Sequence, residues 1–453
     1  MASGSSRRRH RGLALQALVF VLTGLAVVGG IAFLVAFRTA LYHRLVSFPR
    51  EMRAWEALRA QRIEVALDDG YTDYQGVCHS HSEISHDSCV PFDEILRVMK
   101  ETGRDFILMS DHCVDGKADY SLHWRGVKDG VLFAPGFEMY EGFMPWGLPT
   151  DTVLECGEDL DTLAQRIDEL GGLLFFAHTE EPRRWDLPQL KGMEIYNLHT
   201  DFLDEELPPL IPDLILNLGK YPDLTFRLIF DRQTAILANW DHLNETRRIV
   251  GIAANDCHQN NGFIGTYTEQ GTVRVRDTSP KTVGEYSLNA LTRPLVRLLF
   301  GPLEPGRELF HVQLDPYERM TRFVATHILA NELHEQAILA ALEQGRVYIG
   351  FDMIVDSTGF TFLAESGGQR ATMGDTLPFA NGLILHAASP VPCRFTIKRH
   401  GESVHQTEGV DMTWTPVEAG KYRVEAELDI CGEWVPWVYT NPIEITAGPM
   451  AKS

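Results

Sequence analysis

The amino-acid sequence predicts an α/β protein with a parallel β/α barrel, an apolar helix before the barrel and a β-sandwich after it. Six strand-length apolar runs each end beside a residue that can bind a metal. A segment with helical spacing, residues 92–103, lies between the first two runs and ends at a glycine. After residue 355, short alternating strands replace this order. We therefore expect the barrel over residues 71–350 and the sandwich over residues 355–447.

The first 70 residues are typical of a membrane anchor followed by a stalk. Residues 1–12 form a basic tail, and residues 13–37 contain no Asp, Glu, Lys or Arg. About 25 such residues can span a bilayer, and they exceed the core of a signal peptide. We expect an uncleaved single-pass transmembrane helix, then a helical stalk over residues 38–70. The positive-inside rule favours a catalytic domain outside the cytoplasm, although arginines on both flanks weaken the asymmetry.

Histidines and carboxylates stand at the ends of the apolar runs. The first run ends in His79 and His81, and the sixth ends in Asp256 and His258. Residues two apart in a strand share a face, so each pair can hold one ion. In a parallel barrel the carboxyl ends of the strands meet at one mouth. The sequence therefore predicts a metal centre at the mouth of the barrel.

These segments resemble the motifs of the polymerase and histidinol phosphatase (PHP) superfamily. The likeness covers residues 71–350 and has the motifs in order, namely His79-Ser80-His81, Ser110-Asp111-His112, Gly136-Phe137-Glu138, Ala177-His178 and Asn255-Asp256-Cys257-His258. The resemblance implies a distorted (β/α)7 barrel that holds two or three divalent ions, commonly Zn, Mn or Fe. It also implies hydrolysis of phosphoesters, with a water molecule on the ions as the nucleophile.

The resemblance also implies a set of eight ligands. They are His79, His81, His86, His112, Glu138, His178, Asp256 and His258. Glu138 would bridge a first ion to a second one, which also takes His178. A third ion would be held by His86, His112 and His258.

One histidine of the family pattern is missing after the glutamate motif, between residues 140 and 177. His199 or Glu141 could fill the gap. The alternative is a two-ion site with a weaker third position.

The expected chemistry suits this ligand set. Paired divalent ions lower the pKa of a water ligand toward about 7 and neutralise the phosphoryl oxygens. Mixed imidazole and carboxylate ligands suit Zn, Fe or Mn. The substrate would be a phosphorylated small molecule or polymer. Arg183, Arg184 and His199 are candidates for binding it, although a solvated basic loop is the alternative for the two arginines.

The composition limits the class of function. A net charge of −21 argues against a nucleic-acid-binding surface, since such binding depends on Lys and Arg. Two alternatives to a phosphoesterase remain open. An amidohydrolase-like enzyme shares the His-x-His opening, but Glu138 takes the place of its bridging carboxylated lysine. A metal-binding scaffold without activity would fit the missing histidine.

The sequence of the C-terminal third predicts a domain that binds or packs and does not carry the catalytic residues. Residues 316–345 read as helical, and the later strands suggest an immunoglobulin-like sandwich. Of the seven cysteines, Cys393 and Cys431 are placed for a disulfide within this domain. The cysteines beside the expected ligands, which are Cys78, Cys113 and Cys257, read as small buried residues.

Overall fold

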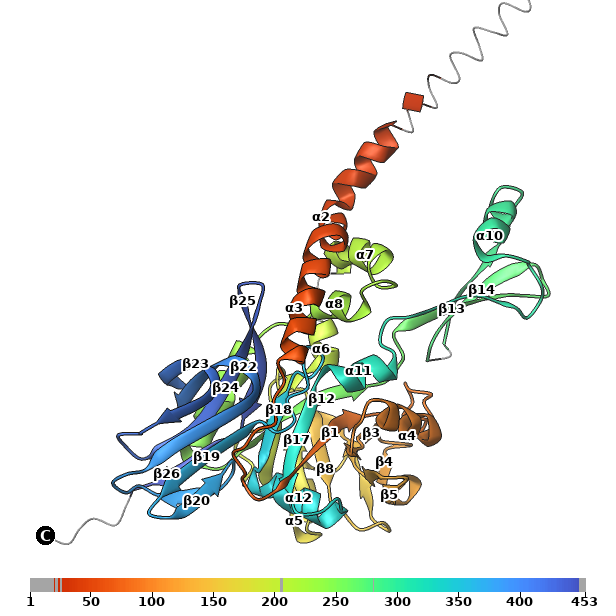
Figure 1. Ribbon diagram of the computed structural model, residues 1–453. Helices are drawn as coiled ribbons and strands as arrows, with labels where there is room; N and C mark the ends of the chain where they lie inside the picture. Colours follow the sequence, from red (N-terminus) through yellow and green to blue (C-terminus); the bar gives the residue numbers. More distant parts are fainter. Residues whose placement is uncertain (1–19, 21–22, 25–26, 204–206, 280, 448–453) are drawn as a thin grey trace, which may run out of the picture. The chain divides into compact units, whose positions relative to one another are not determined.

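The computed structural model describes residues 20, 23–24, 27–203, 207–279 and 281–447 (Figure 1). The chain divides into two compact units. The first comprises residues 1–54 and 204–230, and the second comprises residues 55–203 and 231–453. Each unit is described by itself.

The first unit is helical. Its elements are α2 (Arg38–Tyr42), a π-helical turn (His43–Ser47), the first part of α3 (Phe48–Ala60), α7 (Leu207–Leu216) and α8 (Pro222–Arg227). Nδ1 of His43 lies 2.9 Å from Oδ1 of Asp213, and the Asn217 amide donates to the carbonyl of Ala40. These two polar contacts join the α2 region to the α7 region.

The expected membrane anchor falls largely outside the described residues. Among the residues that are described, no single helix is long and apolar enough to cross a membrane. Two consecutive helices, Val27–Ala36 and Arg38–Ala60, reach the required length and hydropathy together, with a bend of 74° between them. Helix α3 ends at Ala60, and the segment from residue 62 to residue 69 has no helix.

The second unit contains the strands that the apolar runs predict. Strands β6, β2, β1, β12, β11 and β10 follow one another as parallel neighbours. Strand β8 (Phe143–Trp146) is antiparallel to β10, and a bridge joins Gly136 to Trp146. The bounds of the parallel strands are β1 (Thr72–Ser80), β2 (Phe106–Leu108), β6 (Val131–Ala134), β10 (Leu173–Phe176), β11 (Leu190–Asn197) and β12 (Val250–Cys257). All six predicted runs are thus confirmed as strands in a mixed α/β fold.

Helices and short strands complete this half of the unit. The predicted helix after the first strand is confirmed as α4 (Phe92–Glu101), which buries Ile95, Val98 and Met99. The remaining elements are β3 (Asp111–His112), β4 (Lys117–Asp119), β5 (Gly126–Lys128), β7 (Phe137–Glu138), β9 (Val153–Glu155), α5 (Leu160–Glu169), α6 (Leu198–Leu203) and α9 (Thr234–Thr246), with 3-10 turns at Tyr120–Leu122 and Tyr140–Gly142. The core under the parallel strands includes Cys78, and Cys257 is also fully buried, as expected.

The helical interpretation of residues 316–345 is confirmed at both ends of the segment and wrong in its middle. The structure has α11 (Tyr317–Phe323), strand β17 (Ala325–Ala330) and α12 (Glu335–Gln344). Strand β17 is antiparallel to β1 and to β18 (Val347–Gly350), and each of its residues is buried. A strand buried on both faces lacks the alternation that marks a half-exposed strand, so its apolar residues resemble those of the helices beside it.

The C-terminal strands continue the main sheet and are mostly antiparallel, except that β21 and β26 pair in parallel. They are β19 (Thr361–Ser366), β20 (Gln369–Thr372), β21 (Thr376–Pro378), β22 (Ile384–Arg399), β23 (Glu402–Trp414), β24 (Gly420–Ile430), β25 (Glu433–Thr440) and β26 (Ile443–Thr446). Strand β22 pairs with β23 and β24, and β18 pairs with β25. The side chain of Asn441 donates to the carbonyls of Gly251 and Val347 and accepts from the Gly251 amide. The C-terminal strands therefore share backbone pairing with the half of the unit that contains β1 and β12.

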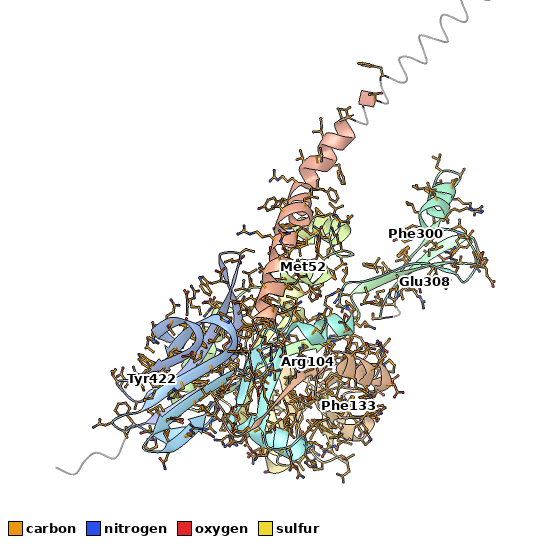
Figure 2. The ribbon with its side chains drawn as sticks, in the orientation of Figure 1. Met52, Arg104, Phe133, Phe300, Glu308 and Tyr422 are labelled. Carbon is orange, nitrogen blue, oxygen red and sulfur yellow. A yellow bond between two sulfur atoms is a disulfide. The ribbon has the colours of Figure 1, made fainter. Side chains whose placement is uncertain are left out.

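A separate four-stranded sheet, which the sequence analysis does not distinguish, forms an inserted module over residues 262–313. Its strands follow the order β15-β14-β13-β16. The elements are β13 (Gly262–Tyr267), β14 (Thr272–Asp277), β15 (Thr282–Ser287), α10 (Thr292–Phe300) and β16 (Glu308–Gln313). Tyr267, Val273 and Leu309 form its own small core, and Figure 2 marks Phe300 on α10 and Glu308 on β16.

The disulfide differs from the expected one. Cys113 is bonded to Cys156, 43 residues further along the chain, and Cys393 is a buried thiol. The expected bond between Cys393 and Cys431 is therefore wrong, and Cys113 is more than a small packing residue. Spacing along the chain could not indicate the disulfide, because the pairing of β4 with β9, which lies beside both cysteines, arises only in the fold.

Candidate metal centre

Strand irregularities shape the candidate metal centre. The pairing of β1 with β12 shifts register between Cys78 and Ser80, and β11 shifts against β12 after Glu194. His79, His178 and Asp256 have positive φ angles of 61°, 49° and 50°. Such angles cost about 1–3 kcal/mol in a residue with a side chain, and bulges at strand ends redirect side chains. The candidate ligands therefore lie where the strands depart from regular geometry. The prediction from the sequence relied on regular alternation of side chains along each strand.

The first group of candidate ligands joins both ends of the sequence motifs. Nε2 of His79 lies 3.1 Å from Nε2 of His81 and 3.3 Å from Oε2 of Glu138. Oδ1 of Asp256 lies 3.2 Å from Nε2 of each of these histidines. All four side chains are buried. The structure therefore brings together the four residues expected around the first ion.

His178 contacts the two carboxylates of this first group from another side. Its Nε2 lies 3.1 Å from Oε1 of Glu138 and 3.6 Å from Oδ2 of Asp256. The two oxygens of Glu138 thus face different imidazoles, His178 on one side and His79 on the other. This is the arrangement that a bridging carboxylate requires. His79, His178 and Asp256 have potential ligand atoms within 4.8 Å of one another.

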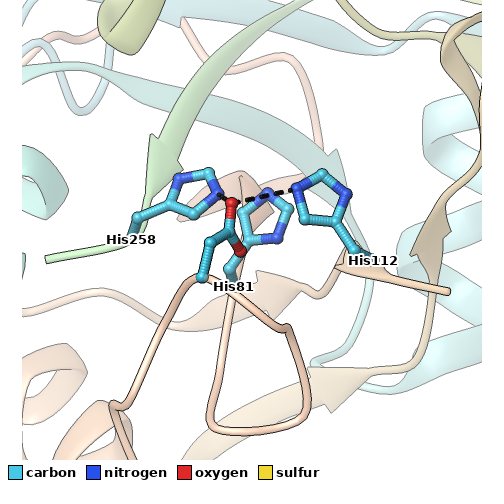
Figure 3. A group of neighbouring side chains, drawn as sticks. His81, His112 and His258 are labelled. Carbon is cyan, nitrogen blue, oxygen red and sulfur yellow. Dashed lines mark ion pairs between the residues drawn. The ribbon is translucent and has the colours of Figure 1, made fainter. Parts of the chain in front are cut away.

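The third group contains a residue that the sequence analysis did not name. His81, Asp87, His112 and His258 have potential ligand atoms within 4.8 Å of one another, and Figure 3 shows the three imidazoles grouped together. Oδ2 of Asp87 lies 3.3 Å from Nε2 of His112 and 3.2 Å from Nε2 of His258. His86 is exposed, and its ring lies 5.0 Å from that of His112. In the structure Asp87, and not His86, completes this group.

His199 lies beside the same centre. With Asp256 and His258 it forms a further group of potential ligands, and its ring lies 5.2 Å from that of His258. Nδ1 of His199 and Oδ1 of Asp87 are buried without a hydrogen-bond partner in the described part of the chain. Buried polar atoms are normally paired, so these two indicate positions where a bound ion would be coordinated.

The imidazoles are oriented by bonds at their outer nitrogens. Oε1 of Glu194 lies 2.5 Å from Nδ1 of His79, and Oε1 of Glu180 lies 3.2 Å from Nδ1 of His178. Nδ1 of His258 contacts the backbone carbonyl of Asp256 at 3.1 Å. Each bond places a proton on Nδ1, so that Nε2 faces the centre and would offer its lone pair to an ion that displaces its own proton. Metal-ligating histidines commonly have this second bond.

Asp111 supports the loop that carries His81. Nδ1 of His81 lies 2.9 Å from Oγ of Ser85, and this hydroxyl donates to Oδ1 of Asp111. Asp111 also accepts from the amide and hydroxyl of Ser82 and contacts Nε2 of His123 at 2.8 Å. The carboxylate is thus saturated by bonds within the loop. It positions His81 and is not among the groups of potential ligands.

The directions of the pKa shifts show that neighbouring positive charge stabilises the ionised form of the buried carboxylates. Burial raises the pKa of Glu138, but the imidazoles of His79 and His178 lower it more, to well below its usual value. Burial lowers the pKa of His178, but bonds to Glu138 and Glu180 raise it to about 12. Burial and the neighbouring His258 lower the pKa of His81 to about 3. Without an ion, protons on some imidazoles balance the carboxylates, and divalent cations would replace these protons.

The two arginines expected to bind substrate are engaged elsewhere. Nε of Arg183 donates to the carbonyl of Ala177, and its guanidinium pairs with Glu181. Arg184 is exposed and pairs with Asp161 and Asp186. Neither arginine is joined to a candidate ligand by these bonds. Substrate binding by Arg183 and Arg184 stays a prediction.

Three residues of the centre were missed by the sequence analysis, and only Glu194 left a signal in the sequence. Glu194 is an acid inside an apolar strand and is 1% exposed, which alone makes it notable. Asp87 follows His86 in an irregular loop, where no periodicity distinguishes the two side chains. Glu180 is two residues beyond His178 in a loop with several acids, and only the fold selects it.

The comparisons with known proteins add little to this geometry. No protein-family model and no curated protein matches the chain. A solved structure from Bacteroides vulgatus, a two-domain protein described as containing a predicted PHP-like metal-dependent phosphoesterase, is similar with a TM-score of 0.35 and 13% identity. The match covers 84% of this chain and 98% of that one. Since a likeness this weak carries no argument, the assignment of function depends on the side chains of the centre.

Proposed function

We propose that this chain is a metal-dependent hydrolase of the PHP type that cleaves phosphoesters with two or three divalent ions. One observation carries the proposal. The Nε2 atoms of buried imidazoles converge on Glu138 and Asp256, while their Nδ1 atoms are held from outside. A structural cluster of ion pairs has no need to direct several Nε2 atoms to one point. Zn, Mn and Fe suit such a ligand set.

Each part of the centre has a role in this proposal. Bound divalent ions would generate a nucleophile from water at neutral pH and neutralise the phosphoryl oxygens. Glu138 would fix the spacing of two ions, because its two oxygens face different imidazoles. Asp87, His112 and His258 would hold the third position. His199 would take the place of the histidine that the family pattern has after its glutamate.

The strands around the centre fit a distorted barrel of this family. The parallel row from β6 to β10, the antiparallel strand β8 and the bridge from Gly136 to Trp146 support a nearly closed arrangement. The antiparallel strand and the bulges would be the distortion. The proposed substrate is a phosphorylated small molecule or polymer other than nucleic acid, because the chain has a net charge of −21.

We also propose a single-pass anchor at the N-terminus with the centre outside the cytoplasm. The uncharged stretch over residues 13–37 supports the anchor. The Cys113–Cys156 disulfide supports the location, since disulfides persist in oxidising compartments and are rare in the cytosol. Protease added to intact cells should then digest the second unit. Protection until the membrane is opened would contradict the location.

Metal analysis and hydrolysis test the proposed activity together. The purified chain should contain two or three transition-metal ions and hydrolyse p-nitrophenyl phosphate or its bis-ester. Glu138→Gln should abolish hydrolysis and lower the metal content, since an amide cannot bridge two cations. The matched control is Glu169→Gln on the exposed face of α5, which should change neither quantity. A metal-free chain whose stability does not rise with added Zn or Mn would contradict the proposal.

A further inference from the structure

Helix α10 of the inserted module presents an apolar edge to solvent. Leu291, Leu295, Leu298 and Leu299 are 85%, 53%, 82% and 64% exposed. Their spacing of four, three and one residues places them along one face of the chain as it enters and follows α10. Scattered single leucines are common on surfaces, but an aligned group on one short helix indicates an interaction site.

The helix is a defined element of the fold. The Asn289 side chain accepts from the backbone amides of Leu291 and Thr292, which caps the first turn. Gly301 follows the last turn with a φ of 85°, a conformation that favours glycine. Val296 and Phe300 pack against the core of the module. The exposed leucines therefore lie on the side of the helix that faces away from its own core.

The charges around this edge reverse the sign of the rest of the chain. No Asp or Glu occurs from residue 286 to residue 303, whereas Arg293 and Arg297 lie on α10. The whole module has six Lys or Arg and five Asp or Glu, against a net charge of −21 for the complete chain. The helix thus has exposed leucines on one face and two arginines on the opposite face, on a protein that is otherwise strongly acidic.

We propose that α10 inserts its leucine edge into a membrane surface that contains anionic lipids. A short helix with leucines on one side and arginines on the other is suited to the boundary between headgroups and acyl chains. The arginine side chains can extend to the phosphates while their alkyl parts stay in apolar surroundings. The interaction is independent of the proposed hydrolysis and of the N-terminal apolar stretch.

Charge selects a membrane over a second copy of this chain. Two α10 helices packed together would carry four arginines, and no carboxylate in residues 286–303 would compensate their charge. An anionic lipid surface attracts the same arginines and accepts the leucines. It repels the acidic remainder of the chain, so this module is the part suited to approach it.

Photocrosslinking of the full-length chain in vesicles tests the proposal. Leu298 is replaced by p-benzoylphenylalanine, and the chain is reconstituted in phosphatidylcholine with about 30% phosphatidylserine. We expect a lipid adduct of residue 298 by mass spectrometry. The control is the same replacement at Val417, which is 81% exposed in the turn between β23 and β24 and should yield no adduct. A crosslink to a second copy, or no adduct at residue 298, overturns the proposal.

The role of the arginines has its own measurement. Vesicles of pure phosphatidylcholine should lower the yield of the adduct by about tenfold, as should Arg293→Gln with Arg297→Gln in anionic vesicles. Hydrolysis of the phosphoester should be unchanged in these variants, which shows that the chain is folded. An equal yield in neutral and anionic vesicles would overturn recognition of anionic lipid.

Discussion

Oε1 of Glu194 lies 2.5 Å from Nδ1 of His79, and Oε2 of the same carboxylate accepts from the backbone amide of His178. Glu194 thus fixes two candidate ligands from a third strand. Glu194→Gln removes the negative charge that holds the His79 proton. We expect metal affinity to fall by about 10–100-fold with little change in fold. Titration against a competing chelator measures this, and Glu169→Gln is the control. Unchanged affinity would mean that His79 is oriented by its strand alone.

Asp87 and His86 are neighbours whose roles differ in the structure. Asp87→Asn should weaken the site that includes His112 and His258, because an amide is a poorer ligand than a carboxylate. His86→Asn should have little effect, since His86 is exposed and outside the groups of potential ligands. The number of bound ions in each variant, measured by elemental analysis, separates them. The reverse order of effects would restore His86 as the ligand.

Removal of the Cys113–Cys156 disulfide should destabilise the protein. A closed loop of this length corresponds to about 4 kcal/mol in the chain-entropy model. Cys113→Ser with Cys156→Ser should therefore lower the free energy of unfolding in urea by a few kcal/mol. Cys89→Ser, at an exposed thiol, is the matched control and should change it little. Equal stability of the natural protein, the double variant and the control would show that the disulfide constrains neither the folded nor the unfolded state.

We expect the stability of the folded protein to depend on pH through His327, which lies far from any candidate ligand in the sequence. Its ring nitrogens contact Asp73 at 2.9 Å and Asp352 at 3.3 Å. Burial lowers its pKa, but the two carboxylates raise it more, to about 10. The unfolded value is about 6.5. The imidazolium therefore contributes stability that is complete below about pH 6.5 and is lost as the pH rises through about 10.

The variant His327→Asn tests this dependence. The difference in unfolding free energy between the natural protein and the variant should amount to a few kcal/mol at pH 6.5 and should shrink toward pH 10. Urea titrations at several pH values, with both proteins free of metal, measure it. A difference that grows with pH would show that His327 is neutral in the folded protein. Ser357, His327 and Asp73 are connected as in a hydrolase triad, but Ser357 and His327 are fully buried, so the row is structural.

Asn441 joins the two halves of the second unit through a buried side chain. Asn441→Ala would leave the amide and carbonyl of Gly251 without these partners, and the free energy of unfolding should fall by roughly 3 kcal/mol. Asn381→Ala, at an exposed turn, is the control. Truncation near Phe351 should have a larger effect, because it removes β25 from its pairing with β18. An active, soluble truncated protein would show that this pairing is dispensable.

The sequence allowed the strands and most of the centre to be predicted because both leave local signals. Apolar runs that stop at His79, Glu138 or Asp256 mark the end of a strand and a possible ligand together. The choice between His86 and Asp87 could not be made, because it depends on how an irregular loop folds back on β3 and β12. The positive φ angles of His79 and Asp256 were equally invisible, since they arise from bulges that the neighbouring strands impose.

Larger errors came from elements whose pattern depends on tertiary burial. Strand β17 has no alternation, because β1 and β18 flank it and both faces are covered. The inserted module shows the opposite problem, since its small core leaves most of α10 exposed. In both cases the deciding information is the identity of the neighbours, which a single segment of sequence does not contain.

The hydrogen bonds between Asn441 and Gly251 also restrict which segments of the chain recombination could exchange. If the sandwich were an independent module, recombination could exchange it between related genes without cost to the rest. Here the exchanged segment would have to supply an amide that fits the backbone of β12, and β12 would need a glycine, because a Cβ there would lie 2.8 Å from the Trp240 ring. The two regions are therefore expected to vary together, and chimeras between distant relatives should express poorly unless both partners of the bond come from one parent.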